Sequence, residues 1–224
     1  MAVRVRVTTW SLEMTDPGQL RPASRPVEVE LRRAELPSPE FGRFLYATTG
    51  GNWYWIDRRS WTFERWLERL SHPRVEIWVL YRRGTPAGYF ELDGGAEGEV
   101  EIAYLGLFPA FIGQGLGGWL LTEAIRRSWA MGAGRVWVHT CTLDAPGALA
   151  NYRARGMRVF AEEVSVVEIP AEPLGPWPGA GVRGPRASPT PTIRAEPPSV
   201  ARATEGRTPE EGLEPDRGGP AGRG

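Results

Sequence analysis

Three glycines at alternating positions, Gly113, Gly115 and Gly117, follow an apolar run and precede a segment with helical periodicity. Glycine permits backbone angles and close approaches that a Cβ atom forbids, so successive N–H groups can converge on an anion. The apolar spacing over residues 116–125 puts these glycines at a helix N-terminus, where unpaired donors and the helix dipole favour a phosphate. The pattern predicts pyrophosphate binding. The alternative is a turn that needs glycine only for tight packing.

Two other nucleotide-binding motifs do not fit this spacing. A Walker loop ends in Gly-Lys-Ser/Thr, and the chain contains no lysine. A dinucleotide fingerprint needs Gly-x-Gly-x-x-Gly early in a parallel sheet, with an acidic residue about twenty positions later. Here the order is Gly-x-Gly-x-Gly-Gly after several predicted strands. Neither motif therefore explains the glycines.

The segment around the glycines resembles the most diagnostic motif of the GNAT (Gcn5-related) N-acetyltransferase superfamily. In that family a strand ends in an aliphatic-x-Pro turn, and Arg/Gln-x-x-Gly-x-Gly/Ala then leads into a helix. Leu107-Phe108-Pro109 and the run from Ile112 to Gly117 follow this order. Ile112 departs from it, because the family has Arg or Gln there, and Gln114 is expected to stand in for part of that side chain.

A second segment of the same family resemblance lies downstream. Residues 135–142 are predicted to form a strand and residues 146–157 a helix closed by glycine. Tyr152-Arg-Ala-Arg-Gly156-Met157 is similar to the family's Tyr-x-x-x-Gly-Phe ending. The family's Asn in the preceding loop is absent, and Asp144 is the nearest polar residue. The two motifs occur in the family's order between roughly residues 99 and 163.

The resemblance implies an α/β (α+β) fold: a mixed, mostly antiparallel central sheet of six to seven strands with helices on both faces. Alternation and turn signals supply the elements. Residues 1–12 are predicted as an extended lead segment or an edge strand, and Ser60 as the cap of the second helix with Glu64 near its positive end. The other predicted elements are strands 25–32, 75–81, 86–92 and 99–107, a turn at 82–85, and helices 41–48 and 61–70.

The resemblance also implies that acetyl-CoA is the co-substrate. The expected contacts come from the strand before the glycines, the glycine loop, the start of its helix and the later tyrosine helix. The predicted cofactor-binding residues are Leu105, Gly106, Leu107, Ile112, Gly113, Gln114, Gly115, Leu116, Gly117, Gly118 and Asn151. A β-bulge near Gly106 is expected to direct an N–H at the thioester oxygen.

Acylation of an amine requires that the amine lose a proton and that the departing thiolate gain one. In the family several members carry a base where Glu101 lies, so Glu101 is the predicted base, with solvation or pairing to an arginine as the alternative. Strand alternation puts Glu101 on the face opposite Tyr104. Tyr152 is the predicted acid, because a phenol near pKa 10 can protonate a thiolate. His139 remains an alternative base.

The acceptor site is predicted in the aromatic segment between the first two helices. Trp53, Tyr54 and Trp55 can form a wall for an amine or a flat substrate, and Asp57 can attract a cation. The alternative is that these aromatic residues anchor a long loop to the sheet. The acceptor is expected to be a small-molecule or peptide amine, and the sequence does not identify it further.

The composition of the chain bears on its partners, metal binding and location. The net charge is +0, so no global field recruits nucleic acid or an anionic membrane, and neither is expected as a partner. With one cysteine and two histidines we expect no metal site, and Cys141 is interpreted as a packing residue. A cytoplasmic location is predicted, and the resemblance is compatible with a homodimer. We expect an acyltransferase domain over residues 1–170 and a disordered Pro/Gly/Arg-rich tail over 171–224.

The sequence therefore predicts an N-acetyltransferase that moves an acetyl group from acetyl-CoA to a primary amine by direct attack in a ternary complex. The alternative is a non-catalytic acyl-CoA-binding or regulatory module on the same fold. The changes at Ile112 and in the loop before the tyrosine helix favour that alternative, whereas Glu101 and Tyr152 favour the enzyme.

Overall fold

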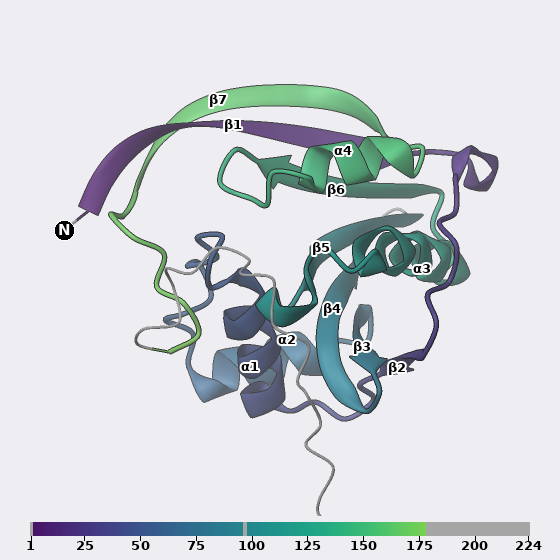
Figure 1. The fold of residues 1–224 in the computed structure, drawn as a ribbon, viewed down its shortest axis with the longest axis horizontal. Coiled ribbons are helices and arrows are strands. Elements are labelled where there is room, and N and C mark those ends of the chain that lie inside the picture. Colours follow the sequence, from purple (N-terminus) through teal and green to yellow (C-terminus); the bar gives the residue numbers. More distant parts are fainter. Residues whose placement is uncertain (1, 96–97, 178–224) are drawn as a thin grey trace, which may run out of the picture. The chain divides into compact units, whose positions relative to one another are not determined.

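The computed structural model describes residues 2–95 and 98–177, which form the mixed α/β fold shown in Figure 1. Most of the predicted tail, residues 178–224, lies outside the described residues. The strands are β1 (Ala2–Met14), β2 (Val29–Arg33), β3 (Val75–Arg82), β4 (Thr85–Gly94), β5 (Glu99–Leu107), β6 (Arg135–Cys141) and β7 (Arg158–Pro170). The helices are α1 (Pro39–Gly50), α2 (Phe63–Ser71), α3 (Leu116–Ala130) and α4 (Ala148–Ala154), with the short 3-10 turns η1 (Pro17–Gln19) and η3 (Pro109–Phe111).

The central sheet has seven strands in the order β2-β3-β4-β5-β6-β1-β7. Every neighbouring pair is antiparallel except β5 and β6, which are parallel. The predicted mixed, mostly antiparallel sheet is therefore confirmed. The single parallel pair follows from the chain path, because α3 connects β5 to β6 as a crossover.

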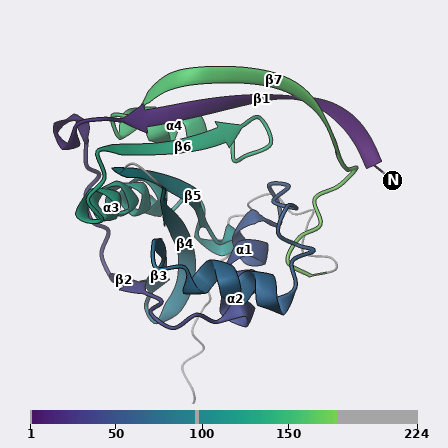
Figure 2. The ribbon, with the colours of Figure 1, turned by 180° about the vertical axis from the view of Figure 1, so that it is seen from behind.

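Helices cover both faces of the sheet, as predicted. Helices α3 and α4 contribute Leu120, Ile125 and Tyr152 to the larger core cluster, which includes Leu12 from β1 and Val136 from β6. On the other face, α1 contributes Leu45 to a smaller cluster with strands β3 and β4. Figures 1 and 2 show the pair α1 and α2 apart from α3 and α4. The two faces therefore carry separate helical layers.

The first helices begin at polar caps. Ser38 caps α1 by accepting a hydrogen bond from the Phe41 N–H, and Pro39 occupies the first helical turn. Helix α2 is capped by Thr62, so the prediction of Ser60 as the cap is wrong. The reason is a turn in which the Trp61 N–H bonds to the Arg58 carbonyl, which delays the start of the helix.

Strand β1 is an interior strand, so its prediction as a lead segment or edge strand is wrong. Residues 9–14 pair with β6 on one side, and β1 pairs with β7 on the other. Leu12 and Met14 are fully buried, which the Val/Arg alternation of the first residues conceals. Within β1, residues 2–8 pair with β7 but not with β6. Strand β2 also begins later than predicted, because Glu28 has a φ of 58° and turns the chain just before Val29.

Strand β5 contains an irregularity at Ala103, not near Gly106 as predicted. Ile102 pairs with Leu92 and Tyr104 with Glu91, so Ala103 is the extra residue of a bulge. The bulge turns Tyr104 to the face of Glu91, which is the face covered by α1 and α2. The predicted alternation, with Tyr104 on the same face as Ile102, is therefore wrong.

Candidate active site

Strands β5 and β6 separate beyond their first three pairs, and a cavity of about 520 Å³ lies where they diverge. Its walls are the second half of β5, the end of β6 with the following loop, the starts of α3 and α4, and the loop between α1 and α2. Because β5 has no β6 partner beyond Glu101, backbone N–H and C=O groups along this edge are available to a ligand.

Most of the residues predicted for the site line this cavity. They are Trp53, Tyr54, Trp55, Leu105, Gly106, Leu107, Ile112, Gly117, Asn151 and Tyr152. Glu101, Gly113, Gln114, Gly115, Leu116 and Gly118 are not among the lining residues. The fold thus brings residues together from four separated stretches of the sequence.

The glycine loop has the backbone conformation that glycine favours. Gly113 has a φ of 81° and Gly115, the residue before α3, a φ of 75°. No described atom lies within 4 Å of a Cβ built at either position, so packing does not explain these two glycines. A side chain there would instead project into open space beside the N-terminus of α3. No side chain caps that N-terminus within the described part of the chain, so its N–H groups remain available.

Two other predicted cofactor residues serve the packing of α3. Leu116 is 1% exposed and lies in the main core. A Cβ at Gly118 would lie 2.8 Å from the Arg155 Nη1 atom, the end of a flexible side chain that would have to shift, and 3.3 Å from the Ala23 Cβ atom. Both residues contribute backbone, not side chains, to the start of the helix.

The side chains at 112 and 114 do not provide a cation at the cavity. Ile112 lines it with an apolar side chain. Gln114 accepts a hydrogen bond from Arg82 and donates one to the Ala110 carbonyl at 2.7 Å, so its amide is already bonded within the protein. Gln114 thus links the glycine loop to Arg82, the last residue of β3.

Tyr152 reaches the cavity from α4 with its ring in the main core. The side chain is 6% exposed, and burial, together with the charge of Asp144, raises the pKa of its phenol well above the ordinary value. The phenol is therefore protonated at neutral pH, and burial makes it a weaker acid than a phenol in water. Neighbouring Asn151 donates a hydrogen bond of 3.3 Å to the Gly117 carbonyl, which ties α4 to the start of α3.

Glu101 and His139 lie side by side across the divergence of β5 and β6. The Glu101 Oε1 atom is 3.3 Å from the His139 Nδ1 atom, and His139 lines the cavity whereas Glu101 does not. The hydrogen bond to Glu101 raises the pKa of His139 above 6.5, and the charges of Asp144 and Asp57 act in the same direction. The imidazole is therefore the member of the pair that faces a ligand.

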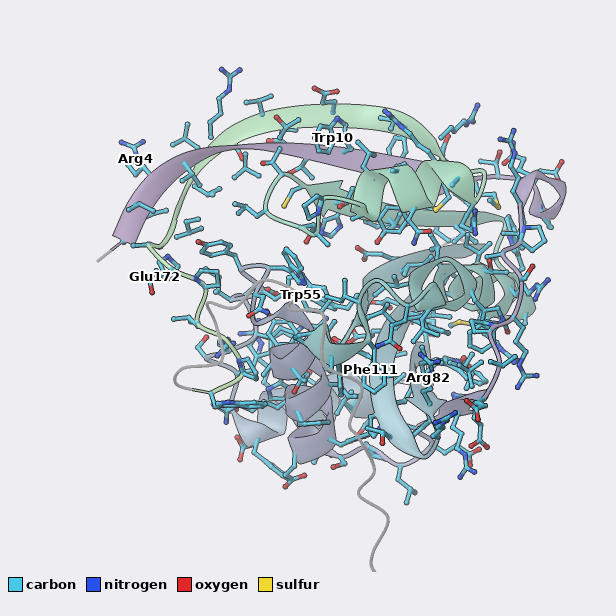
Figure 3. All side chains as sticks on the ribbon, viewed as in Figure 1. Arg4, Trp10, Trp55, Arg82, Phe111 and Glu172 are labelled. Carbon is cyan, nitrogen blue, oxygen red and sulfur yellow. The ribbon has the colours of Figure 1, made fainter. Side chains whose placement is uncertain are left out.

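The aromatic segment forms a wall of the cavity and is also anchored to the sheet. The Trp55 ring lies 4.8 Å from the Tyr104 ring, and its Nε1 atom donates to Asp144 at 3.4 Å. A Cβ on Gly50 would lie 2.1 Å from the Trp55 ring, so glycine at 50 makes room for the indole. Tyr54 has a φ of 59°, a strained conformation for a bulky residue. Figure 3 labels Trp55 near the centre of the molecule.

Sequence reasoning missed a buried network behind this wall. Arg58 is 6% exposed and forms two hydrogen bonds, of 2.7 and 2.9 Å, with Glu91, which is 1% exposed. The guanidinium also lies over the rings of Tyr104 and Trp61, at 4.3 and 4.6 Å from their centroids. The sequence signal that could have revealed this network is Glu91, a charged residue within the otherwise apolar predicted strand 86–92.

Within residues 2–95 and 98–177, no group of three or more His, Cys, Asp or Glu side chains is arranged to hold a metal ion. In the same part of the chain, none of the helices has the length and apolar character needed to cross a membrane. Burial raises the pKa of the Cys141 thiol, which lines the cavity, so this cysteine is not activated as a nucleophile.

A match to a protein-family model shows which family this chain belongs to. The model of the acetyltransferase (GNAT) family matches residues 34–157, more than half of the chain. The chain belongs to the GNAT family. The match contains α1, α2, β3 to β6, α3 and α4, and thus the strand, glycine loop and tyrosine helix that line the cavity.

Solved structures of similar fold include GNAT proteins. A GCN5-related N-acetyltransferase from Sphaerobacter thermophilus superposes with a TM-score of 0.55 at 20% identity, over 72% of this chain and 51% of that one. A GCN5-related N-acetyltransferase from Kribbella flavida gives a TM-score of 0.53 at 20% identity, over 73% and 58% of the two chains. This chain therefore spans only about half the length of these GNAT proteins, and the likeness concerns the fold. Comparison with curated proteins gave no match.

Proposed function

We propose that this protein transfers an acetyl group from acetyl-CoA to a primary amine by direct attack in a ternary complex. The observation that carries the proposal is the cavity at the divergence of β5 and β6. An unpaired strand edge, a helix N-terminus behind left-handed glycines, a protonated tyrosine and a histidine all face it. Membership of the GNAT family supports the same activity.

The residues fit acetyl-CoA by two independent features. Gly113 and Gly115 leave open space at the N-terminus of α3, where N–H groups and the helix dipole favour a pyrophosphate. The free edge of β5 over Leu105 to Leu107 offers donors and acceptors to an amide-containing arm, as a neighbouring strand would. When bound, acetyl-CoA supplies a thioester carbonyl that an amine can attack.

The chain's own residues supply the proton transfers. His139, oriented by Glu101, accepts a proton from the amine, and backbone N–H groups of β5 stabilise charge on the carbonyl oxygen. Tyr152 donates its phenolic proton to the departing sulfur. The new N–C bond and the broken C–S bond leave an amide and free CoA, and the protein regains its starting protonation by exchange with water. Glu101, the base expected from the sequence, thus acts through His139.

The test uses the full-length protein. Acetyl-CoA and free CoA are titrated while tryptophan fluorescence and heat are recorded, and a panel of amines is then screened for release of the CoA thiol. The proposal expects micromolar binding of both ligands and thiol release that depends on an amine. Absence of acetyl-CoA binding at millimolar concentration would refute it.

A second candidate, a non-catalytic acyl-CoA-binding module on the same fold, is favoured by one observation. Ile112 lines the cavity and provides no hydrogen-bond donor where the family has Arg or Gln. The same experiment separates the two, because a binding module would bind acetyl-CoA and release no thiol with any amine. The residue 1–170 domain, the disordered tail, the cytoplasmic location, the homodimer and the lack of nucleic-acid and membrane partners stay predictions.

A further inference from the structure

We propose that Asp57 binds a second positive charge on the acceptor, so that the preferred acceptor is a diamine or polyamine and not a monoamine. This inference rests on the proposed acetyl transfer and names the class of amine. Its basis is the position of one carboxylate in the aromatic wall of the cavity.

Two phenols hold the Asp57 carboxylate in place. The Tyr46 hydroxyl donates to Oδ1 at 2.6 Å, and the Tyr104 hydroxyl donates to Oδ2 at 2.5 Å. Burial and these bonds raise the pKa of both phenols well above the ordinary value, so both stay protonated donors. Each carboxylate oxygen has a further lone pair, and Asp57 itself is exposed and lines the cavity. The carboxylate is therefore oriented in advance for a ligand.

Arg58 and Arg69, the arginines of the buried network behind the aromatic wall, are paired with carboxylates other than Asp57. Arg58 is held by Glu91, and Arg69 bonds to Glu91 and to Asp93, both at 2.5 Å. Among the described residues, the charged or titrating side chains on the cavity are Asp57, Asp144, His139, Tyr54, Tyr104, Tyr152 and Cys141, with no arginine. The carboxylates of Asp57 and Asp144 thus give the cavity a negative field, which favours a cation and disfavours an anionic acceptor.

Aromatic residues line the same cavity as Asp57. Trp53, Tyr54 and Trp55 line the cavity in the same loop as Asp57, and the Tyr104 ring contacts Trp55. Ring faces attract ammonium groups, most strongly where water is partly excluded. The left-handed Tyr54 adds to the argument, because strain in a bulky residue persists where the surrounding structure enforces it, commonly at ligand sites.

The reacting amine and the second charge occupy different positions in this arrangement. His139 accepts a proton from the reacting amine, so that nitrogen becomes neutral before it attacks. The ammonium at Asp57 keeps its charge throughout and contributes to binding only. A monoamine can occupy one position but not both, and an amino acid would put a carboxylate beside Asp57.

The test compares three acceptors of similar length: putrescine, butylamine and γ-aminobutyric acid. Initial rates of thiol release with saturating acetyl-CoA give kcat/KM for each, for the wild type, Asp57→Asn and the control Glu30→Gln. Glu30 is an exposed carboxylate on β2, an edge strand of the sheet, and it is not among the residues that line the cavity, so its variant removes one negative charge outside the cavity. Binding of putrescine to the CoA complex is measured separately by calorimetry, which requires no turnover.

We expect putrescine to exceed butylamine at least tenfold in kcat/KM, and Asp57→Asn to reduce that ratio to about one, in keeping with loss of one charge-assisted contact. Glu30→Gln should keep the wild-type ratio. Equal rates for putrescine and butylamine in the wild type would overturn the inference while acetyl transfer stands. Asp57-dependent binding of putrescine without turnover of any amine would support the subsite and refute the proposed function. Absence of putrescine binding would overturn the subsite.

Discussion

On the α3 side of the cavity the groups that face a ligand belong to the backbone, whereas on the α1 and α2 side they are side chains. The first side consists of the free edge of β5 and the N–H groups at the start of α3, with left-handed glycines between them. The second consists of Asp57 with the phenols of Tyr46 and Tyr104, supported by Arg58 and Glu91.

This difference has a chemical consequence. A backbone site accepts a ligand common to many proteins, since its donors are present whatever the neighbouring side chains are. Under the proposed function it would also tolerate Ile112, because the helix N-terminus keeps its donors. A site made of side chains recognises one class of acceptor and can be altered by single substitutions. Under the proposed function, the backbone wall would bind the cofactor and the side-chain wall would select the acceptor.

The largest effect is expected at the backbone wall. Gly115→Glu introduces a negative side chain into the open space at the N-terminus of α3, at a φ of 75°. We expect acetyl-CoA affinity to fall at least 100-fold, measured by calorimetry. Gly132→Glu is the matched control, because Gly132 has a φ of 85°, equally open surroundings, and lies after the other end of α3. Equal losses in both variants would show that strain, and not the anion site, causes the effect.

The next effect tests the residue that α4 directs into the cavity. Tyr152→Phe keeps the buried ring and removes the proton donor, so kcat should fall about 100-fold while the Kd for acetyl-CoA is unchanged. Stopped-flow or steady-state thiol release provides kcat, and calorimetry provides the Kd. Tyr81→Phe on β3, outside the lining residues, is the control. An unchanged kcat in Tyr152→Phe would exclude Tyr152 as the acid.

The third prediction concerns the support of the side-chain wall. Arg58→Met removes the cation over Tyr104 and leaves the buried Glu91 with Arg69 as its remaining partner. The free energy of unfolding should fall by about 3 kcal/mol, because an ionised carboxylate loses part of its compensation in a buried site. Denaturant unfolding measures this loss. The companion variant Arg58→Met/Glu91→Leu should recover part of it, and a double variant no more stable than the single one contradicts the pairing.

The smallest expected effect is a shift in the pH profile of kcat/KM, which tests whether His139 is the base and Glu101 the group that orients it. The pKa of His139 is raised chiefly by Glu101, so the rise of kcat/KM with pH should lie above pH 6.5, where His139 loses its proton. Glu101→Gln removes that stabilisation of the protonated form, so the rise should move to lower pH, although the charges of Asp57 and Asp144 still raise the pKa of His139. The pH profile of kcat/KM measures the shift. A large loss of kcat without a shift would identify Glu101 itself as the base.

Much of the backbone wall could be predicted from the sequence because its signals are local. The glycine spacing, the apolar repeat after it, the hairpin at residues 75–92 and the strand Glu99–Leu107 each depend on neighbours in the chain. The cap of α2 and the place of β1 in the sheet were not predicted correctly. A turn at residues 58–61 decides the first, and pairing with β6 and β7 decides the second.

The side-chain wall was predicted only in outline. The aromatic residues and Asp57 were recognised as an acceptor wall, but Tyr104 was assigned to the opposite face. One extra residue at Ala103 reverses the alternation of β5, and no local signal marks it. Tyr46 and Glu91 were missed because their partners, Asp57 and Arg58, lie 11 and 33 positions away in the sequence.

The sequence by itself determined the family, the glycine loop and the order of the elements, because these depend on residue types at fixed short spacing. The tertiary structure decided which side chains face the cavity: the partnership of Glu101 with His139, the orientation of Tyr104 and the anchoring of Asp57 by two phenols. The physical reason is that strand register and bulges rotate whole side chains from one face to the other. These features are fixed by packing between segments that are distant in the chain.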